Sequence, residues 1–143
     1  MKNPISDELT DAMEIAERAH MGQKYGPKQK YIEHPIRLAE KFEEPTLKIV
    51  ALLHDVVEDS NTTVKEIYWR FGSVIANAVE ALTREKESYD DYIEAVARNN
   101  IARRVKIEDL LDNIDYMDRH PDWGFTSLRP RYEAALEVLE RGN

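Results

Sequence analysis

The sequence contains no cysteine among its 143 residues, which excludes a disulfide framework and any metal site built from thiolates. It has no apolar run that approaches the roughly 20 residues of a membrane-spanning helix, so we expect no contact with a membrane. Basic residues are scarce, with 20 Lys and Arg against 28 Asp and Glu, a formal net charge of −8. Because nucleic-acid-binding proteins generally present a basic surface, we do not expect this chain to bind nucleic acid.

The remaining composition is typical of a soluble globular chain. Hydrophobic residues make up 42% and charged residues 34%, and a chain of this length can bury one core. We therefore expect a single domain over residues 1–143. The sequence becomes polar directly after Met1, so we expect no signal peptide and a cytoplasmic location. The oligomeric state is left open.

The hydrophobic pattern predicts an all-α fold. Apolar residues recur with helical spacing in every substantial segment, and no segment shows the alternation of a strand. Glycine, proline and capping residues separate these segments. We expect a bundle of seven or eight helices, near residues 7–22, 35–42, 46–59, 64–71, 73–82, 89–98, 99–114 and 127–141.

One predicted helix combines an apolar run with titratable residues. The run Ile49–Leu53 is followed by His54, Asp55, Glu58 and Asp59. At about 100° per residue, these four side chains fall within an arc of about 140° on one helix. Three carboxylates and an imidazole are costly to bury without compensation, which favours a bound metal cation. The alternative is a solvated acidic helix end, above all for Glu58 and Asp59.

A later predicted helix carries a second polar face. Lys106, Asp109 and Asn113 are spaced three and then four residues apart, so they share one side of the helix. Taken alone, such a face is typical of solvated salt bridges. We expect Asp112 and Asp115 on the outside of the same helix.

His34 stands directly before Pro35 at the entrance of a predicted helix, where a side chain is held firmly and can point into a cleft. A lone histidine at such a position is more often a cap or a surface residue. Together with His54, Asp55 and Asp109, however, it provides two imidazoles and two carboxylates, which balance a divalent cation. Mixed nitrogen and oxygen ligands with added water suit manganese, iron or magnesium better than structural zinc.

The segment 23–31 carries positive charge and two tyrosines, and a Gly-Pro pair breaks any helix there. Two interpretations stay open. The segment is either a mobile anion-binding flap, in which Tyr25 stacks on a base, or a solvated surface loop. We interpret His20, near the end of the preceding helix, as a core histidine bonded to nearby backbone.

Four segments, taken in order, resemble one known family. They are Ala19–Gln23 (AHMGQ), Tyr31–Pro35 (YIEHP), Leu53–Ser60 (LHDVVEDS) and Val105–Asn113 (VKIEDLLDN). They are similar to the hydrolase domain of RelA/SpoT-type proteins, a branch of the HD superfamily of metal-dependent phosphohydrolases. The resemblance implies an HD-domain helical bundle and a stand-alone small alarmone hydrolase of the metazoan SpoT-homologue type. The implied reaction converts guanosine 3′,5′-bis(diphosphate), ppGpp, to GDP and pyrophosphate.

The same resemblance implies roles for individual residues. One divalent ion, Mn²⁺ by expectation, would be held by His34, His54, Asp55 and Asp109. Glu58 and Asp59 match the acidic pair that positions or deprotonates the attacking water. Contacts to the phosphorylated nucleotide are expected from Asn113, Lys24, Tyr25, Arg84 and Lys106.

This sequence departs from the family at two positions that concern substrate recognition. Tyr25 stands where these hydrolases have a base-stacking arginine, and Asp115 stands where an arginine often follows Asn113. Two other functions therefore stay open. One is an HD-type nucleotidase or phosphatase acting on another nucleotide. The other is a non-catalytic nucleotide-binding module, against which the acidic pair Glu58 and Asp59 argues.

Overall fold

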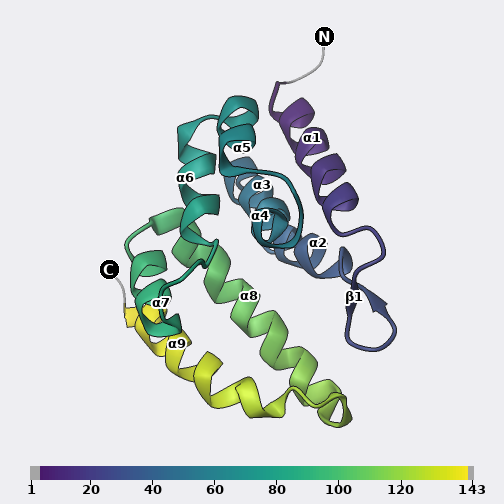
Figure 1. The fold of residues 1–143 in the computed structure, drawn as a ribbon, viewed down its shortest axis with the longest axis vertical. Helices are drawn as coiled ribbons and strands as arrows, with labels where there is room; N and C mark the ends of the chain where they lie inside the picture. The colour runs from purple at the N-terminus through teal and green to yellow at the C-terminus, as the bar shows by residue number, and fades with distance from the viewer. Residues whose placement is uncertain (1–3, 142–143) are drawn as a thin grey trace.

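Helices form almost all of the computed structural model, which describes residues 4–141 (Figure 1). The α-helices of this part are α1 (Pro4–Ala19), α2 (Glu33–Glu40), α3 (Pro45–Leu53), α4 (Val56–Asp59), α5 (Val64–Phe71), α6 (Ser73–Ala81), α7 (Tyr89–Ala97), α8 (Asn100–Arg119) and α9 (Arg129–Arg141). Two 3₁₀ turns, η1 (Pro121–Trp123) and η2 (Thr126–Leu128), join α8 to α9. The all-α prediction is confirmed. The prediction that there is no signal peptide rests on the first residues of the sequence, of which residues 1–3 lie outside the described part.

The predicted helix over residues 46–59 is interrupted. Helix α3 ends at Leu53, and Asp55, with φ −111° and ψ 3°, separates it from the single turn of α4. The arc of 140° was derived for one continuous helix, so it does not describe the observed arrangement. Counting α3 and α4 as two parts of one broken helix gives eight helices within residues 4–141, as predicted.

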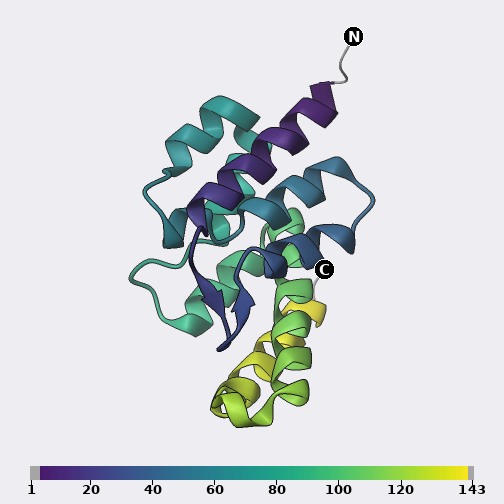
Figure 2. The same ribbon diagram turned by 90° about the vertical axis from the view of Figure 1, so that its right-hand side faces the viewer.

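A short hairpin was not predicted. Strand β1 (Lys24–Tyr25) pairs antiparallel with β2 (Gln29–Lys30), with Lys24 opposite Lys30. The tight turn contains Gly26, whose φ of +74° is accessible to glycine at little cost. Figure 2 shows the hairpin projecting from the end of α1, beside the start of α2. Two-residue strands are too short for a period-2 pattern to appear in the sequence.

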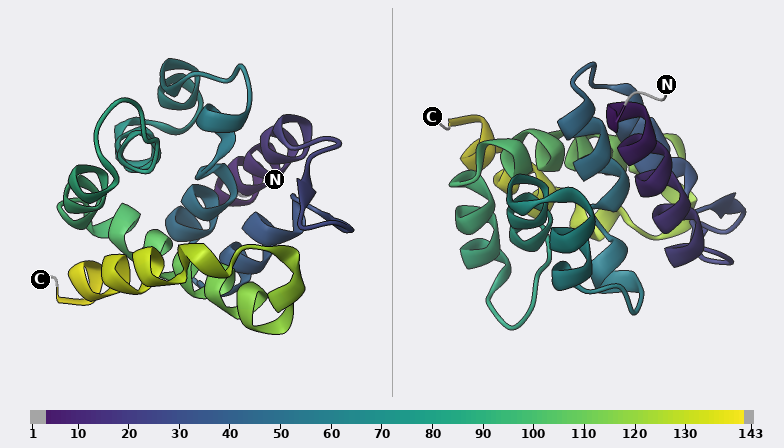
Figure 3. Two further views of the ribbon diagram at one scale, coloured as in Figure 1. Left: turned by 60° about the horizontal axis from the view of Figure 1, so that its bottom comes forward. Right: turned by 90° about the horizontal axis from the view of Figure 1, so that it is seen from above.

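The core is built around α3, which packs against α1, α2, α6 and α8. Its residues Leu52 and Leu53 are buried, as are Leu38 of α2 and Leu110 of α8. Burying each such leucine contributes about 1.5–3 kcal/mol. Because Leu110 directly follows Asp109, its burial fixes where that carboxylate lies. Helices α8 and α9 run side by side and cover the remaining side of the core (Figures 1 and 3).

Local capping explains why several helices begin where they do. Thr63 and Glu66 form a reciprocal capping box at the start of α5. The side chains of Ser88 and Asn99 accept hydrogen bonds from backbone N–H groups at the starts of α7 and α8. These starts agree with the predicted boundaries. Within residues 4–141, no helix has both the length and the apolar character to cross a membrane.

Candidate metal centre

Three helical elements bring His34, His54 and Asp109 together. His34 lies in the first turn of α2, His54 caps the end of α3, and Asp109 lies midway along α8. One ligand atom from each residue lies within 4.8 Å of the other two, and all three residues are buried. We call these residues the histidine–aspartate cluster. The predicted convergence of three distant segments is therefore observed.

The ring of His54 is held in a defined tautomer by the backbone. Its Nδ1 lies 2.6 Å from the carbonyl oxygen of Ala51, which can only accept a hydrogen bond, so Nδ1 carries the proton. The opposite atom, Nε2, is buried and has no hydrogen-bond partner, although Asp55 Oδ2 lies at 3.0 Å and Asp109 Oδ1 at 3.5 Å. A buried imidazole nitrogen facing two carboxylates is an arrangement that a cation satisfies.

His34 lies between two carboxylates. Its Nε2 lies 2.8 Å from Asp109 Oδ1, and its Nδ1 lies 2.7 Å from Asp112 Oδ2. Burial alone would lower the pKa of His34, but the hydrogen bonds to Asp109 and Asp112 outweigh burial and raise it. A negative environment that favours a proton on this ring also favours a divalent cation in the proton's place.

Asp55 lies beside the cluster and is partly buried. Its Oδ2 accepts a hydrogen bond from the hydroxyl of Tyr31, in addition to its proximity to His54. Burial would raise the pKa of Asp55, but the neighbouring His54 holds it well below its usual range. The carboxylate is therefore ionised and adjacent to His54 Nε2, as a metal ligand must be.

Asp109 is the charge on which the cluster converges. Its Oδ1 faces both histidines, and its Oδ2 accepts a hydrogen bond from Lys106 Nζ at 2.8 Å. Burial would raise the pKa of Asp109, but Lys106 and the two histidines lower it well below its usual range. Asp109 therefore stays ionised although it is only 5% exposed.

Glu58 and Asp59 lie on the single turn of α4 and are exposed. Glu58 Oε1 accepts a hydrogen bond from the backbone N–H of Arg84 at 2.6 Å, and Asp59 Oδ2 accepts one from Gln23 Nε2 at 3.1 Å. Partial burial of the carboxyl group raises the pKa of Glu58, despite the Arg84 N–H. The two side chains therefore have different hydrogen-bond partners, and neither belongs to the histidine–aspartate cluster.

Three of the predicted substrate contacts lie together. Lys24, Tyr25 and Asn113 line a cavity of about 270 Å³ between the hairpin, α8 and the C-terminal helix. The Tyr25 hydroxyl donates a hydrogen bond to Asn113 Oδ1, and the Tyr25 ring stacks on His34 with a centroid distance of 4.9 Å. Tyr25 therefore links this cavity to the cluster.

The other two predicted contacts are placed differently. Lys106 is largely buried and its ammonium group is paired with Asp109, within the cluster's surroundings. Arg84 is exposed and lines a separate hollow with Glu58, where its Nε donates a hydrogen bond to the carbonyl oxygen of Glu87. Arg84 is thus grouped with the acidic turn, on a different cavity from Lys24 and Tyr25.

The prediction that Asp112 lies outside is wrong. Its side chain is 8% exposed and contacts both His34 and Arg37. Asp115, three residues later, is exposed and paired with Arg119, as predicted. The sequence shows only that Arg37 follows His34 by three residues and Asp112 follows Asp109 by three, so each pair shares one face of its own helix. It does not show that the two faces meet.

His20 is buried as predicted, but its partner is a side chain. Its Nδ1 lies 2.8 Å from Gln23 Oε1, and its ring contacts that of Tyr31 with a centroid distance of 4.6 Å. Because Gln23 also contacts Asp59, these residues connect the end of α1 to the acidic turn of α4.

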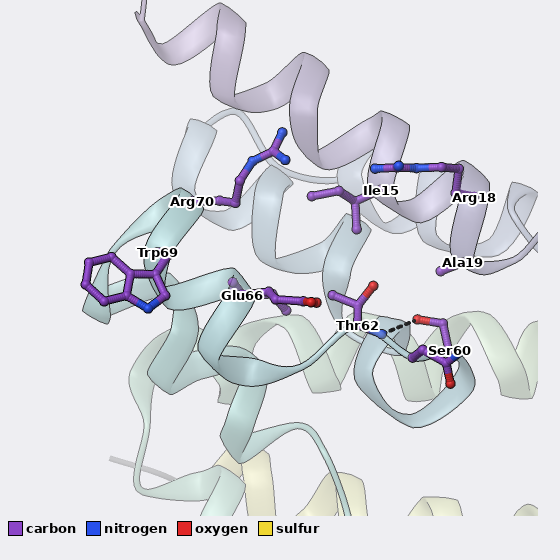
Figure 4. Close-up of a pocket in the computed structure, with 10 residues that line it drawn as sticks. Ile15, Arg18, Ala19, Ser60, Thr62, Glu66, Trp69 and Arg70 are labelled. Atoms are coloured by element: carbon purple, nitrogen blue, oxygen red, sulfur yellow. Dashed lines mark hydrogen bonds between the residues drawn. The ribbon is translucent and has the colours of Figure 1, made fainter.

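A separate cavity of about 610 Å³ lies between α1, α5 and the segment before α5 (Figure 4). Arg18 of α1 and the exposed Trp69 of α5 are among its lining residues. Its other charged groups already have partners, since Arg70 pairs with Asp11 and Glu66 belongs to the capping box. It contains no histidine and is separate from the cluster.

The donor set fits one divalent cation. Ligands about 2.0–2.2 Å from a common ion lie roughly 3–4.4 Å from one another. The distances from His54 Nε2 to Asp55 and Asp109, 3.0 and 3.5 Å, fall in this range, and the 2.8 Å between His34 and Asp109 lies just below it. The unpartnered Nε2 of His54 is the observation that most directly indicates a missing positive charge.

The chain is similar to hydrolases of guanosine alarmones. It is 35% identical to guanosine-3′,5′-bis(diphosphate) 3′-pyrophosphohydrolase of Aquifex aeolicus, over 94% of this chain and 20% of that protein. It is 36% identical to the bifunctional (p)ppGpp synthase/hydrolase SpoT of Escherichia coli K12, over 64% of this chain and 14% of that protein. The chain thus spans a fifth or less of the length of these curated relatives.

A solved structure shares the fold. It belongs to a metazoan orthologue of SpoT described as hydrolysing ppGpp, and it superposes with a TM-score of 0.72 and 22% identity over 92% of this chain and 83% of that chain. This likeness establishes the helical architecture. The model of the HD domain family matches residues 12–119, and the chain belongs to this family.

Proposed function

We propose that this chain is a metal-dependent phosphohydrolase that removes the 3′-pyrophosphate of ppGpp. The observation that carries the proposal is the buried histidine–aspartate cluster with an unpartnered His54 Nε2. The names of the relatives that act on ppGpp support this choice of substrate. In this proposal, one domain over residues 1–143 carries the whole site.

We further propose Mn²⁺ as the ion and His34, His54, Asp55 and Asp109 as its protein ligands. Two imidazoles and two carboxylates, completed by water, suit a six-coordinate ion of this kind. When bound, the ion polarises a phosphate oxygen and lowers the pKa of a coordinated water. The Tyr31 hydroxyl donates to Asp55 Oδ2, the oxygen that lies 3.0 Å from His54 Nε2, and so restrains that carboxylate beside the cluster.

Glu58 and Asp59 act on the attacking water in this proposal. Glu58 accepts its proton, and the raised pKa of this carboxyl group makes it a better base than an ordinary glutamate. Asp59, held by Gln23, orients the water. The water oxygen adds to the phosphorus on the ribose 3′ oxygen, that P–O bond breaks, and the 3′ oxygen takes up a proton. The products are GDP and pyrophosphate.

The nucleotide would occupy the region around the 270 Å³ cavity. Tyr25 offers a ring face for the base, Asn113 an amide for the ribose or phosphates, and Lys24 a charge for phosphate. Tyr25 must first release His34 or Asn113, since it contacts both. Arg84 and Lys106 are the further proposed phosphate contacts, from the side of the acidic turn and from α8.

The decisive experiment incubates the purified chain with Mn²⁺ and ppGpp and measures GDP and pyrophosphate. We expect equimolar products, and no turnover after chelation of the metal. Asp55→Ala should abolish metal binding and turnover together, whereas Asp118→Ala, a change of an exposed aspartate on α8, should preserve both. Turnover of other nucleotides but not ppGpp would refute the proposal that ppGpp is the substrate. Binding of ppGpp without any turnover would refute the proposal that the chain is an enzyme and would favour a nucleotide-binding module.

A further inference from the structure

We propose that Arg37 and Asp112 form a positioning pair that fixes the ring of His34 with Nε2 presented to the metal. This inference rests on the metal-binding part of the proposed function. Neither residue belongs to the histidine–aspartate cluster, and neither is one of the proposed metal ligands. Their role would be exerted through His34 alone.

The contact between Asp112 and His34 is short and shielded. Asp112 Oδ2 lies 2.7 Å from His34 Nδ1, and the two side chains are 8% and 1% exposed. An ionised carboxylate can only accept a hydrogen bond, so this contact keeps the proton on Nδ1. The lone pair of a neutral His34 is then on Nε2, which faces Asp109 Oδ1 at 2.8 Å.

Arg37 holds Asp112 in turn. Its Nε donates to Oδ1 and its Nη2 to Oδ2, both at 3.0 Å, which is a two-point contact between a planar guanidinium and a carboxylate. The Arg37 guanidinium also lies over the ring of Tyr116, 4.7 Å from its centroid. Asp112 therefore cannot rotate away from His34 without breaking both contacts with Arg37.

The two histidines of the cluster are oriented in the same way by different means. His54 has its Nδ1 on the carbonyl oxygen of Ala51, and His34 has its Nδ1 on Asp112. In both cases Nε2 is left for the common centre. A hydrogen bond from the second ring nitrogen is the usual device by which proteins fix a metal-binding histidine, and its loss typically costs about 10–100-fold in metal affinity.

The spacing of the residues makes this arrangement rigid. His34 and Arg37 lie three residues apart on α2, and Asp109 and Asp112 lie three residues apart on α8. Each helix therefore presents two neighbouring side chains on one face, and α2 packs against α8. The helix that supplies one proposed ligand thus supplies the group that orients another.

The test compares Mn²⁺ binding by titration calorimetry in the full chain and its variants. We expect Asp112→Ala, the isosteric Asp112→Asn and Arg37→Gln to weaken binding, with Asp112→Ala losing about 10–100-fold. Asp115→Asn is the matched control, because Asp115 lies on the same helix and pairs with an arginine but is exposed. It should bind Mn²⁺ like the unmodified chain.

Two readouts separate positioning from a general structural effect. In a His34→Ala background, Asp112→Asn should cause no further loss of Mn²⁺ affinity, since its effect passes through His34. The second readout is nitrogen-15 NMR of the chain loaded with Zn²⁺, which is diamagnetic. In the unmodified chain, the proton on His34 Nδ1 should be protected from exchange with solvent. In Asp112→Ala, the same proton should exchange rapidly.

Unchanged Mn²⁺ affinity in folded Asp112→Ala and Asp112→Asn would overturn the inference while leaving the hydrolase proposal intact. The inference would also be overturned if Asp112→Asn lowered Mn²⁺ affinity in the His34→Ala background by the same factor as in the unmodified chain. If the unmodified chain binds no divalent ion, the metal-binding proposal itself fails, and this inference fails with it.

Discussion

Individual side chains decide what the histidine–aspartate cluster can hold. Both histidines use Nδ1 for a protein acceptor, and both direct Nε2 toward Asp109. The Asp109 carboxylate also accepts a hydrogen bond from Lys106, so it contacts three side chains: the two histidines and this lysine. Replacing any of these groups changes the charge balance of a buried site, whereas Glu58 lies outside the cluster, on the exposed turn of α4.

Glu58 gives a prediction about pH. Because the pKa of its carboxyl group is raised, Glu58 becomes protonated, and inactive as a base, at a pH above the usual 4.5. Turnover of ppGpp should therefore fall on acidification through that raised pKa, as measured by pyrophosphate release across a pH series. Glu58→Gln should remove turnover at every pH while Mn²⁺ binding persists. An unchanged acid limb in Glu58→Gln would show that another group is the base.

The same shift has a consequence for stability. The folded chain holds the Glu58 proton more tightly than the unfolded chain, so the contribution of this group to stability falls as pH rises through the raised pKa. Glu58→Gln keeps an oxygen for the Arg84 N–H and removes the charge. Its free energy of unfolding at neutral pH should equal or exceed that of the unmodified chain in urea titrations. A clearly lower free energy of unfolding for Glu58→Gln would contradict this predicted direction.

At the scale of elements, two features place the site: the break between α3 and α4, and the hairpin. The break at Asp55 turns the acidic residues of α4 away from the axis of α3. The hairpin is held against the C-terminal part of the chain, since the ring of Trp123 lies directly against Gly26. Tyr25, next to Gly26, is kept over His34 by this contact.

Gly26 and Gly22 form a matched pair for testing the hairpin. Both have positive φ, but a Cβ on Gly26 would lie 2.2 Å from Trp123 Cζ3, whereas one on Gly22 would meet nothing within 4 Å. Gly22→Ala should cost about 1–2 kcal/mol of unfolding free energy from the backbone alone. Gly26→Ala should cost more by thermal or urea unfolding, and Trp123→Ala should remove the excess in a double-mutant cycle. Equal costs for the two glycines would refute the contact.

The capping box predicts the stability of α5. Thr63 Oγ1 accepts from the N–H of Glu66 at 3.2 Å, and Glu66 Oε2 accepts from the N–H of Thr63 at 3.0 Å. Thr63→Ala should therefore cost about 0.5–2 kcal/mol, while Thr63→Ser should cost little. Thr62→Ala, one residue earlier and outside the cap, is the control in urea unfolding. A Thr63→Ala variant as stable as this control would contradict the role of the cap.

On the scale of the whole molecule, the cluster joins α2, α3 and α8. An ion held there would bind the folded chain and not the unfolded one, so it would stabilise the fold. At a Mn²⁺ concentration 100 times the dissociation constant, the expected gain is about 2.7 kcal/mol. The net charge of −8 adds a general attraction for cations, which salt would screen.

Asp109→Asn tests this linkage. It preserves the size of a buried side chain but removes the charge that faces both histidines and Lys106. We expect the melting temperature of the unmodified chain to rise with Mn²⁺ and fall with a chelator, and Asp109→Asn to lose this dependence. Asp115→Asn, at an exposed position, should keep it. Full Mn²⁺-dependent stabilisation of Asp109→Asn would place the ion elsewhere.

Most helices were predictable because their signals are local. Helix α5 occupies residues 64–71 as predicted, since a capping threonine precedes it and Gly72 follows it. The break at Asp55 was not predictable, because the apolar run before it and Val56 and Val57 after it continue a helical pattern. Helix α8 extends to Arg119, five residues beyond the predicted end, because Tyr116 and Met117 are buried by tertiary contacts.

The sequence by itself determined the class of fold and the chemical character of the site. Periodicity, capping residues and glycines are read from neighbours along the chain. The His-Asp pair after an apolar run favoured a compensating cation, with a solvated acidic helix end as the alternative. Only the tertiary structure decided that Asp112 lies inside, bonded to His34 and Arg37, and that Tyr25 covers the cluster. These outcomes depend on which faces of α2, α8 and the hairpin meet, and the packing of distant segments sets those faces.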